Sequence, residues 1–143
     1  MTVARILAVK GRDVFTTQPH RTLQETARLL HDKGVGALVV TGADGAVLGI
    51  ISERDLVRAL AERGAVALDD AVSRHMTSDV FTTTSGVCII DIMERMTQSR
   101  FRHVPVVEDG RLAGLVSIGD VVKHRIAEIE TEHRALRDYI ATA

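Results

Sequence analysis

Gly49-Ile50-Ile51-Ser52-Glu53-Arg54-Asp55 is the stretch that decides the fold, and it returns as Gly114-Leu115-Val116-Ser117-Ile118-Gly119-Asp120, 65 positions later. In each copy a short apolar run is typical of the end of a strand that is covered on both faces. The serine then takes the N-cap position of a following helix. The pattern therefore predicts a strand-to-helix turn that occurs twice.

The two turns also place polar groups close together. Asp55 and Asp120 fall one helical turn after Ser52 and Ser117, on the same side of the helix start. A hydroxyl, backbone N–H groups and a carboxylate then converge, which suits a phosphate and the vicinal hydroxyls of a ribose. The same Ser-x-x-Asp spacing is close to a capping box, in which the side chains only satisfy helix donors. Both interpretations remain open at this point.

A second echo shows that the whole chain is an internal repeat. The stretch Asp13-Val14-Phe15-Thr16-Thr17 recurs as Asp79-Val80-Phe81-Thr82-Thr83, 66 positions later. In each half, the pattern between the repeated stretches predicts a helix, a strand, a turn and a strand. In the first half these are 23–30, 37–40, 41–45 and 47–51, and in the second half they are 89–96, 104–107, 108–110 and 112–116. We expect an α+β fold of two β-α-β-β-α repeats. A three-stranded sheet cannot bury both faces alone, so the repeats should pack together.

Composition excludes several classes of protein. The 143 residues are 45% hydrophobic and 26% charged, which is typical of a soluble globular chain. The net charge of −1 provides no overall basic field for nucleic acid or an anionic membrane. No apolar run approaches a membrane span, and the first residues do not resemble a signal peptide. We expect a cytoplasmic protein, with its one cysteine, Cys88, as a buried free thiol.

The chain continues past the second repeat with a helical pattern over 128–143. Apolar residues step by four and three through Val122, Ile126, Ile129, His133, Leu136 and Ile140. Such a narrow seam suggests a partner helix, most simply from a second copy of the chain, so that a homodimer is expected. The alternative is that the helix packs back on its own domain. Between the repeats, over 63–74, we expect a short helix that begins at Asp69-Asp70.

These residues resemble a known family. The frame Gly-Ala-Leu-Val-Val, Asp-Gly and Gly-Ile-Ile-Ser-Glu-Arg-Asp-Leu of the first half is similar to a cystathionine-β-synthase-type (CBS) domain. The second half is similar to a CBS domain too, through the frame Arg-His-Val-Pro-Val-Val, Asp-Gly and Gly-Leu-Val-Ser-Ile-Gly-Asp-Val. The resemblance implies CBS domains at 3–65 and 66–127, in one module with pseudo-two-fold symmetry. Such modules usually bind AMP, ADP, ATP, NAD or S-adenosylmethionine in clefts between the repeats.

The resemblance also implies roles for particular residues. Asp55 and Asp120 match the ribose-binding aspartates, and Ser52 and Ser117 match the phosphate-side hydroxyls. Val14, Phe15, Val80 and Phe81 match the strand segments that line the adenine pocket, and Ala37, Leu38, Val104 and Pro105 match its other wall. Arg102 and His103 match positions that often reach phosphate, and Arg54 could do so from the helix start. Gly36, Thr77 and Arg100 complete the expected nucleotide-binding set.

The two copies differ where ligand would lie. The first has Gly36-Ala37 where the second has Arg102-His103, and Glu53-Arg54 where the second has Ile118-Gly119. The first also has Val39 at the position of Pro105. We therefore expect two clefts that are not equivalent, one of which could hold a different nucleotide or stay empty.

Four functions are compatible with these patterns. The leading one is a sensor that binds AMP, ATP or NAD as a regulatory ligand and acts on an unidentified effector protein or on its own dimer. An enzyme is not expected, because no P-loop, GxGxxG, HExxH or GxSxG occurs and no catalytic residue, catalytic cofactor or metal site is indicated. Nucleic-acid binding would have to use Arg95, Arg100, Arg102 and His103. The fourth function is a structural dimerisation module with empty clefts.

Overall fold

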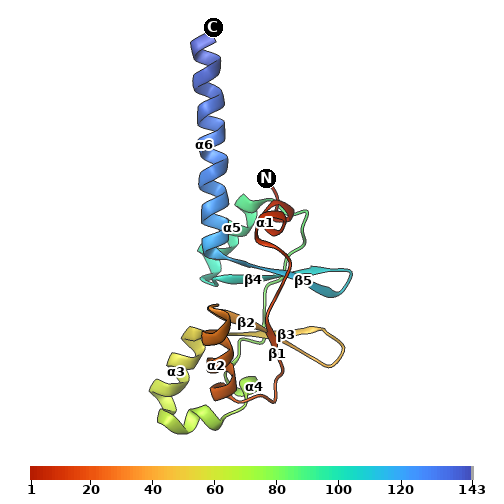
Figure 1. Ribbon diagram of the computed structural model, residues 1–143, viewed down its shortest axis with the longest axis vertical. Coiled ribbons are helices and arrows are strands. Elements are labelled where there is room, and N and C mark those ends of the chain that lie inside the picture. Colours follow the sequence, from red (N-terminus) through yellow and green to blue (C-terminus); the bar gives the residue numbers. More distant parts are fainter. Residues whose placement is uncertain (143) are drawn as a thin grey trace.

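The computed structural model describes residues 1–142 as two α+β halves and a long helix that projects away from them (Figure 1). The elements, in chain order, are α1 (Val3–Lys10), β1 (Thr16–Thr17), α2 (Leu23–Lys33), β2 (Ala37–Thr41), β3 (Val47–Ser52), α3 (Glu53–Arg63), the 3₁₀ helix η1 (Gly64–Asp69), α4 (Val72–His75), α5 (Ile89–Ser99), β4 (His103–Glu108), β5 (Arg111–Ser117) and α6 (Ile118–Thr142). The predicted α+β class and the long C-terminal helix are confirmed.

The two sheets differ by one strand. In the first half β1 pairs parallel to β2, and β2 pairs antiparallel to β3. In the second half β4 pairs with β5, and the predicted first strand is reduced to a single bridge between Thr83 and Val106. The cause lies at Pro105: its counterpart Val39 donates its N–H to the carbonyl of Phe15 at 3.3 Å, and a proline has no N–H to donate.

Local sequence explains the hairpins and the helix ends. Asp109 and Gly110 both have positive φ, as a two-residue type I′ turn between β4 and β5 requires. Thr22 accepts the N–H of Glu25 and so caps the start of α2. Gly34 ends the same helix in the left-handed conformation.

The two halves exchange their short N-terminal helices. Helix α1, which the sequence places before the first repeat, packs its apolar residues Val3, Ile6 and Leu7 into the core of the second half. The N–H of Val3 donates to the carbonyl of Val87 at 2.9 Å. Helix α4 does the reverse, because Val72 lies in the core of the first half. Each core is therefore completed by a segment from the far side of the repeat boundary, as Figure 1 shows for α1.

The exchanged segments lie against a glycine on each return strand. A Cβ added at Gly114 would lie 2.6 Å from a methyl carbon of Leu7, on α1. A Cβ added at Gly49 would lie 2.6 Å from the carbonyl oxygen of Thr77, which follows α4. These two positions need glycine because another part of the chain passes directly over the strand.

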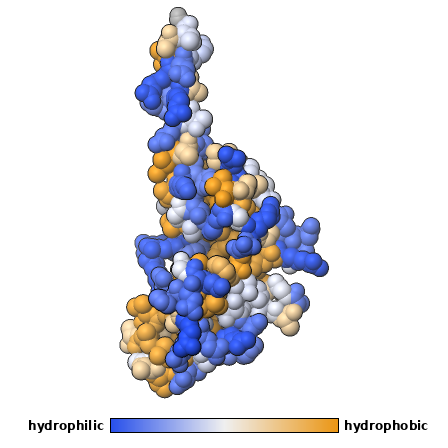
Figure 2. Space-filling model, in the orientation of Figure 1, coloured by the Kyte–Doolittle hydropathy of each residue, from blue (hydrophilic) through white to orange (hydrophobic). Residues whose placement is uncertain are grey.

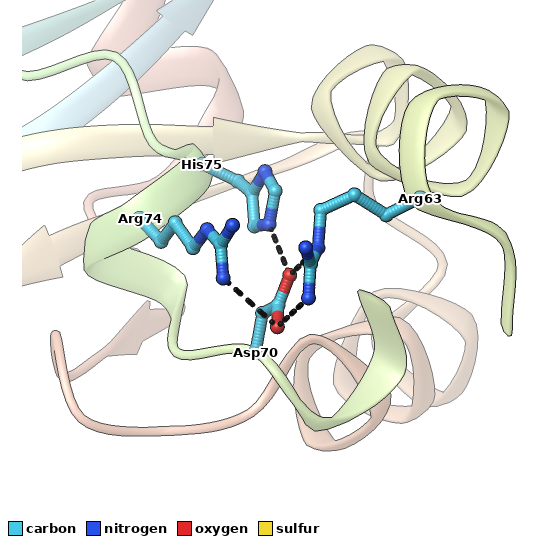
Figure 3. Close-up of polar contacts among 4 residues, drawn as sticks. All are labelled: Arg63, Asp70, Arg74 and His75. Atoms are coloured by element: carbon cyan, nitrogen blue, oxygen red, sulfur yellow. Dashed lines mark hydrogen bonds and ion pairs between the residues drawn. The ribbon is translucent and has the colours of Figure 1, made fainter. Parts of the chain in front are cut away.

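The connector between the repeats is fixed by a cluster of charges around Asp70 (Figure 3). The carboxylate accepts from Arg63 at 2.8 and 3.2 Å and contacts His75 at 2.8 Å, with Arg74 at 3.5 Å. The hydrogen bonds from His75 and Arg63 hold the pKa of Asp70 below its usual value. The expectation that a helix begins at Asp69-Asp70 is wrong: Asp69 ends η1, and the next helix begins at Val72. Asp70 instead joins the end of α3 to α4 through its side chain.

Two further expectations are settled by exposure. Cys88 is exposed and not buried, because it occupies the N-cap of α5, where the side chain faces outward while Ile89 enters the core. The apolar seam residues of α6 are between 43 and 65% exposed, from Val122 to Ile140. The helix therefore does not bury this seam on its own domain. None of the helices in residues 1–142 has the length and apolar character needed to cross a membrane.

Candidate functional site

Both strand-to-helix turns form capping boxes. The N–H of Ser52 donates to Asp55 at 2.8 Å, and the N–H of Asp55 donates back to the Ser52 hydroxyl at 3.4 Å. Ser117 and Asp120 form the same pair of bonds at 2.9 and 3.1 Å. The capping interpretation of the Ser-x-x-Asp pattern is therefore correct at both helix starts, and any ligand role is additional to it.

Other N–H groups at these helix starts are also already used. The N–H of Glu53 donates to the carbonyl of Gly36 at 3.0 Å, and the N–H of Ile118 donates to Arg102 at 2.8 Å. The sequence suggested that free N–H groups would meet an anion, and for these groups that expectation is wrong. An anion at either turn would have to be held chiefly by cationic side chains.

A large cavity lies at the first of the two turns. Its volume is about 850 Å³, and both halves of the chain contribute to it. Nine of the expected nucleotide-binding residues line it: Gly36, Ser52, Arg54, Asp55, Thr77, Val80, Phe81, Arg102 and His103. The remaining lining residues are Ile50, Glu53, Arg58, Asp79, Thr82, Arg95, Ser99 and Phe101. The segment 77–82 of the second repeat thus meets the Ser52–Asp55 turn of the first.

The carboxylate of Asp55 lies deep in this cavity and is 5% exposed. One oxygen accepts the N–H and hydroxyl of Ser52, and the other accepts Arg58 at 2.6 Å. The side chain of Arg58 is 54% exposed while that of Asp55 is 7% exposed, so a ligand could displace the arginine into solvent and take its place at the carboxylate. Each carboxylate oxygen has two acceptor sites, so Asp55 can accept further hydroxyl donors.

Cationic and aromatic side chains also line the cavity. The guanidinium of Arg95 lies over the ring of Phe81 at 4.2 Å, and Phe81 stacks on Phe101 with ring centroids 5.4 Å apart. Arg54, Arg58, Arg95 and Arg102 supply four guanidinium groups, against three carboxylates from Glu53, Asp55 and Asp79. The cavity therefore combines one buried carboxylate, a flat apolar surface and several anion-binding groups.

His103 lies at the start of β4, where both turns are near. Burial lowers its pKa, and the positive charge of Lys10 lowers that pKa further, while Asp120 opposes the shift. A neutral imidazole is thus favoured in the empty protein. An anion bound beside it would reverse part of this effect.

The structure leaves the other expected residues outside this cavity. Ala37, Leu38, Val104 and Pro105 are buried in β2 and β4. Val14 is half-buried, and the ring of Phe15 lies beneath the ammonium of Lys33 at 5.2 Å. Arg100 is exposed and ends α5 in the left-handed conformation. Ser117 and Asp120 belong to the second turn.

The second turn is occupied by a residue that sequence reasoning missed. Lys10, the last residue of α1, donates to Asp120 at 2.6 Å and to the carbonyl of Leu115 at 2.8 Å. Although burial pushes the pKa of Asp120 upward, the bonds from Lys10 and from the N–H of Ser117 lower it on balance. Lys10 and Asp120 are 110 residues apart in the sequence, so no local pattern could indicate the pair. Arg58, by contrast, was readable as a helix neighbour three residues after Asp55.

Comparison with known proteins agrees with the resemblance. The family model described as the CBS domain matches residues 7–62 and again 71–127. The crystal structure of the CBS-domain containing protein ATU1752 from Agrobacterium tumefaciens is 52% identical with a TM-score of 0.84, over 87% of this chain and 92% of that one. The mitochondrial CBS domain-containing protein CBSX3 of Arabidopsis thaliana is 36% identical over 123 residues. Those residues cover 83% of this chain and 60% of that relative.

A structure determined with ligands shares the same fold. The CBS domain pair of protein MJ0100, in complex with 5-methylthioadenosine and S-adenosyl-L-methionine, superimposes with a TM-score of 0.80 over 90% of this chain and 98% of that one. Its identity of 23% supports the fold alone. Together with the two matched segments, which leave only the ends and a short connector uncovered, these findings settle the family. The chain belongs to the CBS-domain family and carries two CBS domains in tandem.

Proposed function

We propose that the cavity at Asp55 binds an adenine nucleotide (AMP, ADP, ATP or NAD) and that this occupancy regulates a partner. The observation that carries the proposal is Asp55: a nearly buried carboxylate that lines a cavity to which four arginines and several apolar side chains also contribute. Vicinal ribose hydroxyls match the carboxylate, and phosphates match the guanidinium groups. A volume of about 850 Å³ is within the usual range for small-molecule sites.

The lining also offers a place for the base. Ile50 and Val80 are aliphatic residues from opposite halves, and the backbone of Thr77 pairs with that of Ile50 at 2.9 Å in both directions. An adenine between the two aliphatic side chains would have the faces of its ring removed from water, and its polar edge could form hydrogen bonds with neighbouring backbone groups. Such a site needs no aromatic platform, which agrees with an aromatic content of 3%.

The placement of the basic cluster favours a small ligand over nucleic acid. Arg95, Arg102 and His103 line the cavity, and Arg95 is already held over Phe81. A surface that binds a nucleic-acid backbone would present such residues along an outer face. We therefore assign the cluster to the phosphates of a nucleotide.

Regulation would follow from the way the cavity is built. Its walls come from the two repeats, so a nucleotide that contacts both will favour one relative arrangement of the halves over another. The altered arrangement could be read by the second chain of a homodimer or by a separate effector protein. We infer a regulatory role and no catalysis of its own, because the two CBS domains account for most of the residues that the structure describes.

The test has two steps. Small molecules released from the purified protein would be identified by mass spectrometry, and AMP, ATP and NAD would then be titrated by calorimetry. We expect at least one of them to bind, and Asp55→Ala to weaken that binding strongly while the protein stays folded. Asp109→Asn, in an exposed hairpin turn whose backbone suits asparagine, is the matched control. A folded protein that binds none of the three at millimolar concentration would favour the structural module with empty clefts.

A further inference from the structure

We propose that α6 pairs with α6 of a second copy as a parallel, in-register coiled coil. The seam on α6 (Val122, Ile126, Ile129, His133, Leu136 and Ile140) is exposed along its whole length. Its steps of four and three residues follow the coiled-coil spacing. In Figure 1 the C-terminal part of the helix extends beyond both halves, and Figure 2 shows hydrophobic residues along it in groups that hydrophilic residues separate. A lone helix with such a stripe is poorly stable in water.

Charged residues beside the seam determine the direction of pairing. In a parallel, in-register pair, a residue on one flank faces the residue five positions later on the partner. Arg125 then faces Glu130 of the partner subunit, and Glu132 faces Arg137 of the partner subunit. The two-fold symmetry doubles both contacts, which gives four pairs of opposite charge. These pairs flank the six layers that the seam residues of the two helices form. Within residues 1–142, Glu130, Glu132 and Arg137 take part in no ion pair, whereas Arg125 is paired with Glu128 of its own helix and would have to exchange or share that partner.

The antiparallel arrangement is disfavoured by the same residues. In an antiparallel pair that overlaps the whole seam, Glu130 faces Glu130 of the partner subunit, and Glu132 faces Glu132 of the partner subunit. Lys123 faces Arg137 of the partner subunit. All of these contacts are between like charges, which destabilise a pair of helices. A shift of one heptad relieves the repulsion but leaves two of the six seam residues of each chain unpaired. Charge complementarity therefore favours the parallel pair.

The body of the molecule agrees with a two-fold axis along α6. Figure 2 shows hydrophobic surface over α3 and η1 along the same edge as the seam. The exposed residues there include Val57, Leu60 and Val66. With parallel helices this surface meets its own copy across the axis, as an isologous interface requires. His133 supplies one polar layer within the seam, which costs stability and helps to fix the register.

The experiment uses the full chain and two kinds of variant. Sedimentation should show a dimer, and Leu136→Cys in a Cys88→Ser background should form a disulfide between identical positions on mild oxidation. Glu132→Lys should weaken the dimer roughly tenfold by placing like charges together twice, and Glu132→Lys with Arg137→Glu should restore it. A monomer at about 100 μM would overturn the proposal. So would cross-linking only in a mixture of Leu136→Cys and Ile126→Cys chains, which an antiparallel pair predicts.

A different observation carries a second inference, which rests on the proposed function. We infer that Lys10 closes the second cleft, so that the chain takes up one nucleotide and not two. The carboxylate of Asp120 is the counterpart of Asp55, yet the ammonium of Lys10 holds it at 2.6 Å and is itself held by the carbonyl of Leu115. Lys10 and the N–H of Ser117 donate to the same oxygen, Oδ2, so a ribose that used both oxygens of Asp120 would have to displace Lys10.

The contrast with the first cleft explains why Lys10 matters more than Arg58. Arg58 is on the same helix as Asp55, is 54% exposed and already lines the open cavity. Lys10 comes from α1, which is packed into the core of the second half; its side chain is 37% exposed, and it makes two hydrogen bonds. By the 66-residue repeat, the position of Lys10 corresponds to Met76, which has no charge to offer. Lys10→Met therefore places at the second cleft the residue type that the first cleft has at the corresponding position.

The test counts bound AMP by calorimetry and assigns each site with Asp55→Asn and Asp120→Asn. We expect one site in the natural chain and two in Lys10→Met, with the affinity at Asp120 raised at least about tenfold. Two sites in the natural chain, or one in both chains, would overturn the closure. Binding only in Lys10→Met, and only through Asp120, would refute the proposed role of the first cleft and leave the closure standing.

A measurement without ligand separates the two ideas further. Carbon NMR of the Asp120 carboxyl should show a higher pKa in Lys10→Met than in the natural chain, because the ammonium favours the charged form. An unchanged pKa would show that the contact is absent and would overturn the closure, whatever the protein binds. Arg58→Met is the matched control and should leave the Asp120 carboxyl unaffected.

Discussion

Replacing Asp55 by asparagine separates the capping role of this residue from its proposed contact with ribose. The amide oxygen can still accept the N–H of Ser52, so the helix start is retained. The bond to Arg58 is lost, because an amide NH₂ would face the guanidinium. That bond is to a half-exposed arginine and is worth about 0.5 kcal/mol. With a weakened cap, the expected loss of unfolding free energy is about 1 kcal/mol, or roughly 3 °C in melting temperature.

The effect of Asp55→Asn on nucleotide binding should be much larger. Two ribose hydroxyls would donate to the charged carboxylate, and the amide keeps only part of that interaction. A loss of about 2–3 kcal/mol follows, which is a 30- to 150-fold weaker Kd for AMP by calorimetry. Asp120→Asn should change this Kd less than about twofold, because Asp120 belongs to the other turn. An unchanged Kd in folded Asp55→Asn would refute the ribose contact and leave Asp55 as a cap alone.

Three further outcomes are expected. Because the pKa of His103 is lowered, a bound phosphate should raise it, and AMP binding should take up protons in the pH range where this imidazole titrates, below the usual histidine value. Calorimetry in two buffers of different ionisation enthalpy would detect this uptake, and equal heats would contradict it. Because the folded-state pKa of Asp70 is lowered, its contribution to stability is present above the unfolded pKa near 4 and is lost as the pH falls through the folded pKa. The melting temperature of Asp70→Asn should therefore change less with pH than that of the natural chain across that acid range. Gly49→Ala should lower the free energy of unfolding by about 1–3 kcal/mol, because the added methyl meets a rigid backbone carbonyl. Gly114→Ala should lower it less, because the added methyl meets a leucine methyl that can move. Chemical denaturation would measure both, with Gly86→Ala, which has open space around it, as the control.

The repeat, the strand-turn-strand units and the helix starts could be predicted from the sequence, because each depends on residues close together in the chain. Ser52 and Ser117 both cap a helix as their spacing indicates. The loss of a strand at Pro105 was also readable in principle, since a proline removes one N–H from any ladder. The exposure of Cys88 depends on its place at the N-cap of α5, one residue before the apolar face begins.

The candidate site was predictable only in part, because its geometry depends on contacts between the halves. The residues around Asp55 follow from one turn, but the arrival of Phe101 and Arg95 beside Phe81 depends on how α5 packs. Helix α1 has only three core residues, and their partners lie more than 80 positions later. The bond between Lys10 and Asp120 follows from that packing, so the inequality of the two clefts had a cause that the sequence could not show.

The exchange of α1 and α4 has a consequence for the order in which the chain can fold during synthesis. Helix α1 leaves the ribosome first, yet Ile6 and Leu7 can dock only after residues up to about Val121 have emerged. The first half can complete its own core much earlier, because Val72 follows it closely in the chain. The nascent protein therefore carries an undocked apolar helix until the second repeat has been made, and the start of α6 supplies the last core residue that packs with it.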